Sequence, residues 1–187
     1  MTWRKPAAVS SALLAVLVIY NGFVSVPVAL ARKGEDGITM LAYRRWLIDP
    51  STAVIDIWSI HGDKSMADVD RNLFKSAEAL KDNSFKSVEL AYHGRGRFMI
   101  DGDAFRQLGK EWHWQSVAHL MSVLPENARG MDGEPAFGTW TGGWLGVLSH
   151  QIEDHNDLHW KWYMASATGS DPESRMPDRS PTPNVDY

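Results

Sequence analysis

Residues 65–101, SMADVDRNLFKSAEALKDNSFKSVELAYHGRGRFMID, decide the fold because they predict a helix followed by two strands. Ser65 and Asp68 are spaced as a variant of the capping box, which opens a helix. The apolar residues that follow form one stripe at helical spacing: Met66, Val69, Leu73, Ala77 and Leu80. Asp70 and Lys75 lie off this stripe, so alanine at either position is expected to change stability by less than about 0.5 kcal/mol.

Two strands follow this helix in the sequence: FKSVELAY (85–92) and RFMID (97–101). A three-residue loop, 93–95, would pair Leu90 with Phe98, whereas a two-residue loop would pair Leu90 with Met99. Because matching hydrophobic faces decide register, the longer loop is favoured, with Gly96 as a bulge. The GRG triplet lacks the further glycines and the Lys-Ser/Thr pair of a phosphate-binding loop, so it is interpreted as a hairpin turn.

Upstream of this stretch, TAVIDIWSIHG (52–62) alternates in polarity and is rich in β-branched residues, which predicts a strand. ITMLAYRRWLIDP (38–50) fits either a short helix or an extended segment. Downstream, AFRQLGKEWHWQSVAHLMSV (104–123) predicts one helix that stops at Pro125, with Asp103 as its N-cap or first-turn acid. Residues 125–138 are expected to form a loop.

The last expected element is an amphipathic helix with a glycine-rich entry, TWTGGWLGVLSHQIEDHNDLHWKWYM (139–164). The element order is therefore β-α-β-β-α-α. This order predicts the α+β class, with a small, largely antiparallel sheet packed against three helices. Residues 32–167 are expected to form this single domain. The tail, 168–187, has four prolines and no aliphatic cluster, which indicates disorder.

The first 31 residues have the features of a secretory signal peptide. Arg4 and Lys5 precede a long uncharged segment that ends in Ala29-Leu30-Ala31. Cleavage is expected between Ala31 and Arg32, which would make the protein periplasmic or secreted, with no membrane contact afterwards. The alternative is an uncleaved anchor in the inner membrane, because the apolar segment is long enough to span a bilayer.

Composition excludes several classes of function. The chain has no cysteine, so disulfides, thiolate catalysis and cysteine-bound zinc are excluded. Without the leader, 17 basic and 23 acidic residues give a net charge of −6. This balance argues against nucleic acid as a partner, since affinity for nucleic acid depends on Lys and Arg. The expected partner is a protein or a small molecule.

Histidines in the last helix are the candidate metal ligands. His155 and His159 fall on its apolar stripe at the i, i+4 spacing that can offer two imidazoles to zinc, whereas His150 falls on the opposite face. His119 is the candidate third ligand. A zincin would carry glutamate at position 156, and this chain has Asn156. We therefore favour structural histidines and no cofactor, with zinc at His119, His155 and His159 as the alternative.

Two tryptophans are the candidate binding residues. Trp160 lies away from the apolar stripe and Trp140 lies in the glycine-rich entry, and exposed tryptophan is enriched where proteins bind partners. No spacing selects a catalytic pair from the carboxylates, which are Asp56, Glu89, Asp101, Asp103 and Glu111. The sequence also lacks a Gly-x-Ser-x-Gly nucleophile motif, so no catalytic residue is predicted.

The segments FKSVEL, FMIDGDAFRQLGKE, LPEN, AFGTWTGGWLGVL and QIED, in that order, resemble a group of small exported bacterial proteins. The resemblance covers about residues 85–162, and His155 and His159 are not part of it. It implies a single exported domain and no particular catalytic residue. The favoured function is therefore a non-enzymatic binding or interaction protein, and the alternative is a metal-dependent hydrolase that uses the three histidines.

Overall fold

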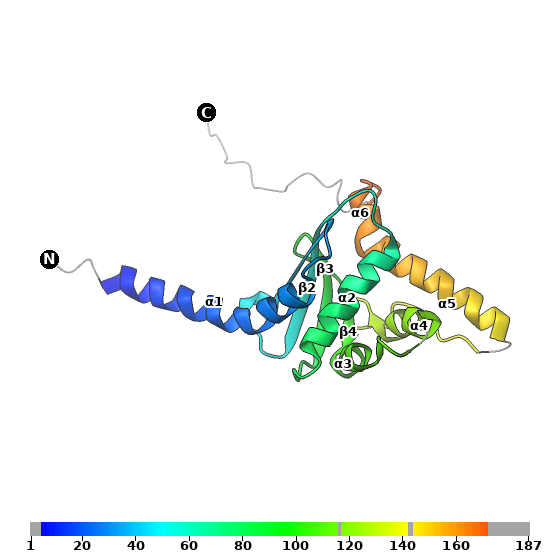
Figure 1. The fold of residues 1–187 in the computed structure, drawn as a ribbon, viewed down its shortest axis with the longest axis horizontal. Coiled ribbons are helices and arrows are strands. Elements are labelled where there is room, and N and C mark those ends of the chain that lie inside the picture. The colour runs from blue at the N-terminus through cyan, green and yellow to red at the C-terminus, as the bar shows by residue number, and fades with distance from the viewer. Residues whose placement is uncertain (1–4, 116, 142–143, 172–187) are drawn as a thin grey trace, which may run out of the picture.

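The computed structural model describes residues 5–115, 117–141 and 144–171 (Figure 1). Its helices are α1 (Lys5–Ala31), α2 (Met66–Leu80), α3 (Gly102–Glu111), α4 (Val117–Asn127), α5 (Trp144–His159) and α6 (Ala165–Ala167). A 3-10 turn, η1 (Arg45–Leu47), and a π-helix, η2 (Trp160–Met164), complete the helical elements of these ranges. The strands are β1 (Ile38–Arg44), β2 (Thr52–Ile60), β3 (Ser87–Tyr92), β4 (Arg95–Asp101) and β5 (Ala128–Arg129).

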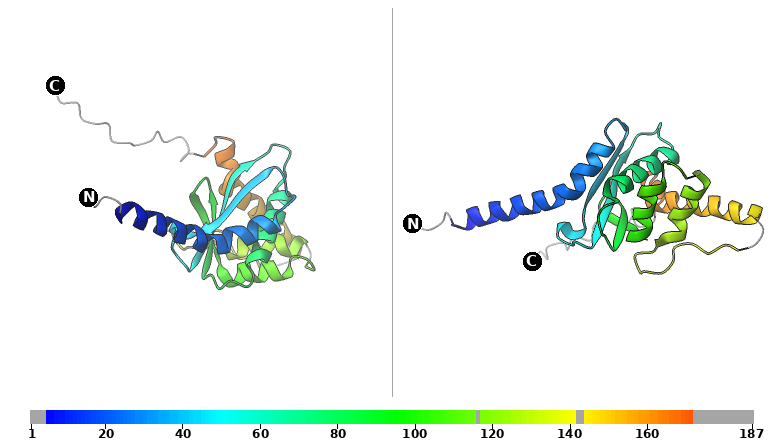
Figure 2. Two further views of the ribbon diagram at one scale, coloured as in Figure 1. Left: turned by 60° about the vertical axis from the view of Figure 1, so that its left-hand side comes forward. Right: turned by 60° about the horizontal axis from the view of Figure 1, so that its bottom comes forward.

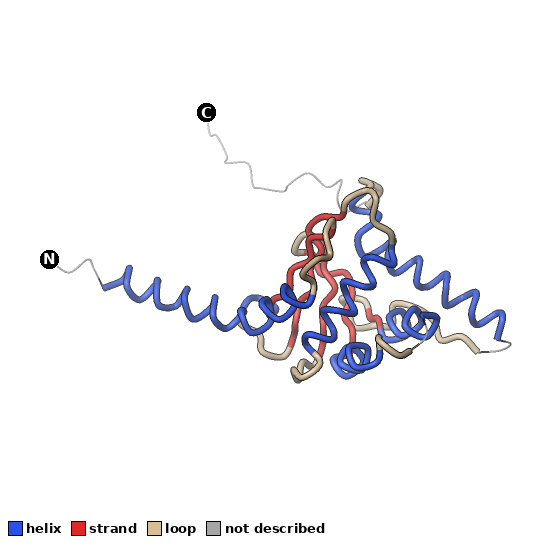
Figure 3. Tube along the Cα trace, in the orientation of Figure 1, coloured by secondary structure: helices blue, strands red, loops and turns tan. Residues whose placement is uncertain are grey.

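The strands form one sheet in the order β1-β2-β3-β4-β5. All neighbouring pairs are antiparallel except β2 and β3, which are parallel and joined through α2. Helix α2 packs between α1 and α3 against the sheet (Figures 1 and 3). The α+β class with a mostly antiparallel sheet is therefore confirmed, and the ambiguous segment 38–50 contains the strand β1 followed by the short turn η1.

The predicted start of α2 is confirmed. The Ser65 side chain accepts a hydrogen bond from the Asp68 amide, and the Asp68 carboxylate accepts one from the Ser65 amide. Val69, Leu73 and Ala77 are completely buried under the sheet. The prediction for Asp70 is wrong, because this carboxylate is also buried, with 6% of its surface exposed. Helix α2 thus buries a polar side as well as its apolar stripe.

The β3–β4 hairpin combines the predicted register with a different turn. Leu90 pairs with Phe98 as expected, but the loop has two residues, His93 and Gly94, both with positive φ. This geometry is typical of the tight turns that join hairpin strands. The register shifts by one residue beside Leu90, which makes Arg97 the extra residue and restores the expected pairing.

The predicted helix 104–123 is divided into α3 and α4. Residues 112–115 form turns between them, which let the Trp112 indole donate a hydrogen bond to Glu78 of α2 (3.1 Å). Asp101 is the N-cap of α3, because its carboxylate accepts from the amides of Asp103 and Ala104, and Asp103 is the first-turn acid, which was the other alternative. Helix α4 continues past Pro125, and the expected loop that follows contains β5.

The two ends of the described chain differ in how they contact the domain. The first half of α1 projects away from the sheet (Figure 2), and Leu13–Ala31 is long and apolar enough to cross a membrane. At the other end, Asp171 lies within the expected tail but is buried, and it accepts a hydrogen bond from Arg97 (2.6 Å). The rest of that tail, 172–187, lies outside the described residues.

Candidate metal centre

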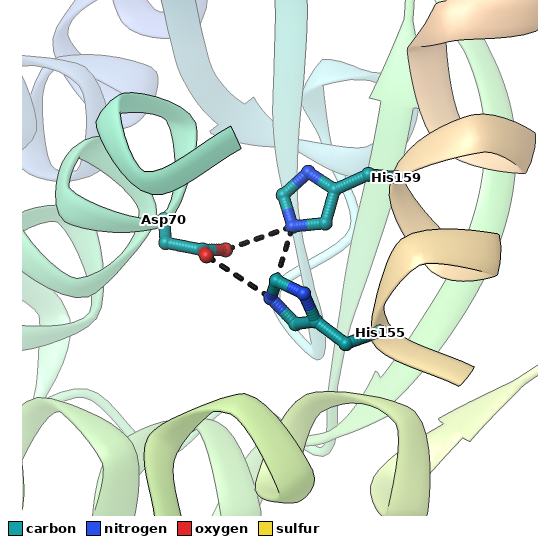
Figure 4. Close-up of side chains that lie close together, drawn as sticks. All are labelled: Asp70, His155 and His159. Atoms are coloured by element: carbon teal, nitrogen blue, oxygen red, sulfur yellow. Dashed lines mark hydrogen bonds and ion pairs between the residues drawn. The ribbon is translucent and has the colours of Figure 1, made fainter. Parts of the chain in front are cut away.

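Three buried side chains from two helices converge on one point: Asp70 of α2, and His155 and His159 of α5 (Figure 4). His155 Nε2 lies 3.0 Å from Asp70 Oδ2, and His159 Nε2 lies 3.0 Å from Asp70 Oδ1. The two Nε2 atoms are 3.2 Å apart. One ligand atom from each residue lies within 4.8 Å of the other two, which is the arrangement that a single small cation requires.

Regular helical spacing accounts for the histidine pair. Residues four apart lie on one face of a helix, so both imidazoles point from α5 toward α2. Immediately after His159 the chain widens into the π-helix η2, a feature that is frequent at functional sites. Within η2, Trp162 is completely buried and donates a hydrogen bond to the Ala91 carbonyl (2.9 Å). This contact fixes the C-terminal end of α5 against β3.

The electrostatics of the cluster favour an ionised Asp70. Burial opposes its negative charge, but the hydrogen bonds and positive potential of His155 and His159 outweigh that effect, and the pKa of Asp70 is lowered. The Tyr163 hydroxyl lies 3.0 Å from His159 Nδ1. Burial and the nearby Asp70 charge raise the pKa of Tyr163, so this hydroxyl stays neutral at physiological pH.

Proton placement distinguishes this cluster from a simple hydrogen-bonded triad. Each Nε2 faces both a carboxylate oxygen and the other Nε2. If both Nε2 atoms carry protons, two hydrogen-bond donors lie 3.2 Å apart, which is unfavourable. If only one Nε2 carries a proton, the other imidazole directs a lone pair at the Asp70 carboxylate, which is also unfavourable. A cation bound by all three lone pairs removes this conflict. A tetrahedral zinc site with bonds of about 2.0–2.1 Å places its ligand atoms roughly 3.3 Å apart.

The second ring nitrogens of the two imidazoles differ. His159 Nδ1 is hydrogen-bonded to the Tyr163 hydroxyl. This bond would orient the ring in the same way that a hydrogen bond to the second nitrogen orients metal-binding histidines. His155 Nδ1 is buried and has no hydrogen-bond partner among the described residues. The site therefore has one firmly oriented imidazole and one that is less constrained.

A cavity of about 520 Å³ opens beside the cluster. Asp70 and His155 form part of its wall, and the cavity is largely apolar elsewhere, with Phe74 and Trp112 among its lining residues. Arg71, Gln115 and Asn156 supply further polar groups to its lining. A cation held by the three side chains would thus be reachable by a small molecule.

The structure brings His155 and His159 together, as a zinc site at these residues requires. The prediction of His119 as the third ligand is wrong. His119 lies on α4 with its side chain 44% exposed and 3.6 Å from Glu111, outside the buried cluster. Asp70 takes its place. Its helical neighbours three and four residues away are all apolar: Met66, Ala67, Leu73 and Phe74. A carboxylate enclosed by apolar neighbours was the signal in the sequence that could have identified it.

The two candidate binding tryptophans lie apart from the cluster and are partly exposed. Trp140 stacks on His150 with ring centroids 3.9 Å apart and donates a hydrogen bond to Asp154 (2.5 Å). Trp160 is 44% exposed and lines a cavity of about 420 Å³ with Arg97 and Phe98.

The remaining candidate carboxylates have separate structural partners. Asp56 is completely buried and accepts hydrogen bonds from Tyr43, Trp58 and the Gly94 amide. Glu89 lies 3.0 Å from the Arg45 guanidinium. Asp101 caps α3, Asp103 bonds to Arg106 and Glu111 bonds to Gln107. None of the five lines the cavity beside Asp70.

No family model, curated protein or solved structure matches this chain.

Proposed function

We propose that this protein binds one divalent metal ion, with zinc the first choice, through Asp70, His155 and His159. The observation that carries the proposal is the convergence of three buried ligand atoms within 4.8 Å, two of them imidazole nitrogens 3.2 Å apart. Two imidazoles and one carboxylate form a ligand set found in catalytic zinc sites, where the remaining position is left for water or substrate.

The adjoining cavity supports a metal-dependent hydrolase as the function of this site. A zinc ion in such a site would lower the pKa of a bound water to about 7. The apolar wall with Phe74 and Trp112 fits a small, largely apolar substrate, and Arg71 or Gln115 would orient its polar end. Tyr163 would keep the His159 ring oriented through its contact with Nδ1. Asn156 stands where a zincin has its glutamate base.

Elemental analysis and thermal unfolding of the purified full chain test metal binding. We expect about one zinc per chain and a melting temperature that falls on chelation, since saturation at a thousandfold excess over Kd contributes roughly 4 kcal/mol. Asp70→Asn, His155→Ala and His159→Ala should abolish the response to chelator. His150→Ala, on the exposed face of α5, is the matched control and should retain it. A metal-free wild type that is insensitive to chelator and to added zinc would contradict the proposal.

A panel of small ester and phosphoester substrates tests hydrolysis separately. Turnover that is lost on chelation and restored by zinc is expected for the wild type and for His150→Ala, but not for the site variants. If zinc binds and no substrate is turned over, the site is a metal-stabilised binding site rather than a hydrolase.

The second candidate function is a non-enzymatic binding protein that recognises its partner through Trp140 and Trp160. It is supported by the cavity that Trp160 forms with Arg97 and Phe98. In either case we place the domain outside the cytoplasm, which is supported by the apolar α1 with its Ala29-Leu30-Ala31 end and by the resemblance to exported bacterial proteins. Alanine at Trp160 should weaken partner binding without altering the response to chelator.

A further inference from the structure

The second half of α1, which the sequence assigns to a cleavable leader, contributes to the core of the domain. Val24 and Val28 are buried at 0% and 1% exposure. Polar side chains of the same helix bond to the sheet: Ser25 donates to the Ala42 carbonyl (2.6 Å), and Asn21 accepts from the Arg44 amide (2.9 Å). Removal of α1 would take these two valines out of the core and leave the backbone groups of Ala42 and Arg44 in β1 without these partners.

The bond expected to be cleaved lies within this packed region. Helix α1 runs to Ala31, and the Arg32 amide still donates to the Val28 carbonyl (3.1 Å). The Arg32 guanidinium donates to the Ile38 carbonyl (2.8 Å) and to Asn72 of α2 (2.6 Å). The chain is therefore bonded to β1 before the Ala31–Arg32 bond, and to both β1 and α2 after it.

The first half of α1 has the opposite character, because its large apolar side chains face outward. Leu13, Leu14, Val16, Val18 and Ile19 are each more than 60% exposed. Farther along, the side of α1 turned away from the sheet still exposes Phe23, Val26 and Leu30. From Lys5 to Asn21 the helix rises about 24 Å, which is less than the roughly 30 Å hydrocarbon core of a bilayer. A bilayer around α1 would therefore extend past Asn21.

Beside Asn21 of α1, a short loop between β1 and β2 exposes three apolar side chains. Trp46 and Ile48 are 76% and 63% exposed, and Leu47 is 49% exposed. Trp46 and Leu47 have φ of 54° and 62°, a left-handed conformation that is uncommon for such residues. The side-chain amide of Asn21 fixes the loop to α1 by donating a hydrogen bond to the Leu47 carbonyl (2.8 Å).

Aromatic and basic side chains surround this loop. The Arg44 guanidinium lies 4.4 Å from the centre of the Tyr20 ring, and the Arg45 guanidinium lies 5.5 Å from that of Trp46. Tyrosine and tryptophan are enriched at membrane–water interfaces, and arginine at that depth can reach the headgroups while its stem stays in apolar surroundings. This combination fits a lipid surface better than a second protein chain.

We propose that α1 is retained in the mature protein, and that a lipid bilayer surrounds its first half and receives the loop Trp46–Ile48 at the interface. The second half of α1 would contact lipid on one side and the domain on the other. The inference is independent of the metal site.

The first test determines the N-terminus of the full chain expressed in a bacterium. Intact mass should show that residues 1–31 remain attached, and the protein should stay in the membrane fraction after a carbonate wash. A soluble protein that begins at Arg32 would overturn the proposal.

Because the chain has no cysteine, single cysteines can report on the loop in nanodiscs of phosphatidylethanolamine and phosphatidylglycerol, where both bilayer faces are open to a polar maleimide. Trp46→Cys and Ile48→Cys should lose most of their labelling in nanodiscs and regain it in detergent. Trp114→Cys is the matched control, since Trp114 is 67% exposed beyond α3, and it should label equally in both.

Two other outcomes would contradict the placement of the loop at the membrane interface. Labelling of position 46 as fast as position 114 in nanodiscs would mean that the loop faces water. Protection that persists in detergent and disappears on dilution would mean that a second copy of the chain covers it.

Discussion

Helix α5 carries two polar clusters built from similar side chains in different surroundings. One joins His155 and His159 to the Asp70 carboxylate. In the other, Trp140 stacks on the His150 ring and donates a hydrogen bond to the Asp154 carboxylate. Both contain short polar contacts. The side chains of His155 and His159 are 3% and 0% exposed, however, whereas that of His150 is 46% exposed.

This difference determines what each contact is worth. Water competes for the exposed groups and screens their charges, so contacts of the His150 kind contribute about 0–1 kcal/mol. Asp70, His155 and His159 have little contact with water, so a broken contact there leaves a buried polar group with little compensation. The buried cluster should therefore govern stability and metal affinity, and the exposed one should contribute little to either.

Asp70→Ala is expected to lower the free energy of unfolding more than any change in the exposed cluster. Measured by urea unfolding in the presence of a chelator, it should lower the free energy of unfolding by about 3–5 kcal/mol, since it removes one partner from a buried, charge-assisted group. Leu73→Ala, less than one turn away, provides an apolar reference with an expected loss of about 2–5 kcal/mol. A loss below about 0.5 kcal/mol for Asp70→Ala would show that the carboxylate lies in water.

Acid unfolding sharpens the contrast through the sign of one pKa shift. The pKa of Asp70 is lower in the folded protein, so the unfolded chain takes up the proton more readily. The contribution of Asp70 is therefore complete above the ordinary aspartate pKa of about 3.9 and is lost as the pH falls through the lower folded value. Unfolding free energies measured against pH should fall more steeply in acid for the wild type than for Asp70→Asn.

Leu73→Ala is the control for this pH series, because it destabilises the fold without changing a titrating group. Its curve should lie below that of the wild type and run parallel to it. An Asp70→Asn curve parallel to the wild type would contradict the proposed linkage.

The smallest effects are expected in the exposed cluster. His150→Ala and Asp154→Ala should each change the free energy of unfolding by less than about 1 kcal/mol, by the same urea measurement. If either matched Asp70→Ala, exposure would not be what separates the two clusters.

Periodic patterns in the sequence predicted the parts of the fold that depend on neighbours along the chain. The capping box at Ser65, the stripe of α2 and the Leu90–Phe98 pairing follow from spacing of two to four residues. The i, i+4 pair of His155 and His159 follows in the same way. The α+β class could be inferred because these elements occur in a regular order.

The remaining features depend on contacts between distant segments, which spacing does not encode. Asp70 and His159 are 89 positions apart, so neither marks the other as a partner. At the break between α3 and α4, Trp112 donates a hydrogen bond to Glu78, which lies 34 positions earlier in the chain. His119 was predicted from the face of a helix that the chain divides in two.

The π-helix η2 has a consequence for tolerated changes in chain length. Its wide turn closes with a hydrogen bond from the Ala165 amide to the Trp160 carbonyl, which takes one residue more than an α-helical turn. An i→i+5 turn of a π-helix covers nearly the same rotation as an i→i+4 turn of an α-helix, so deletion of a single residue here would restore an ordinary helix and leave the segments on both sides in nearly the same orientation. His155 and His159 would still face α2, and Ser166 would still face Arg97, to which it is hydrogen-bonded (2.8 Å). Related chains that lack one residue here would therefore keep both the histidine pair and the attachment of their C-terminal segment to β4.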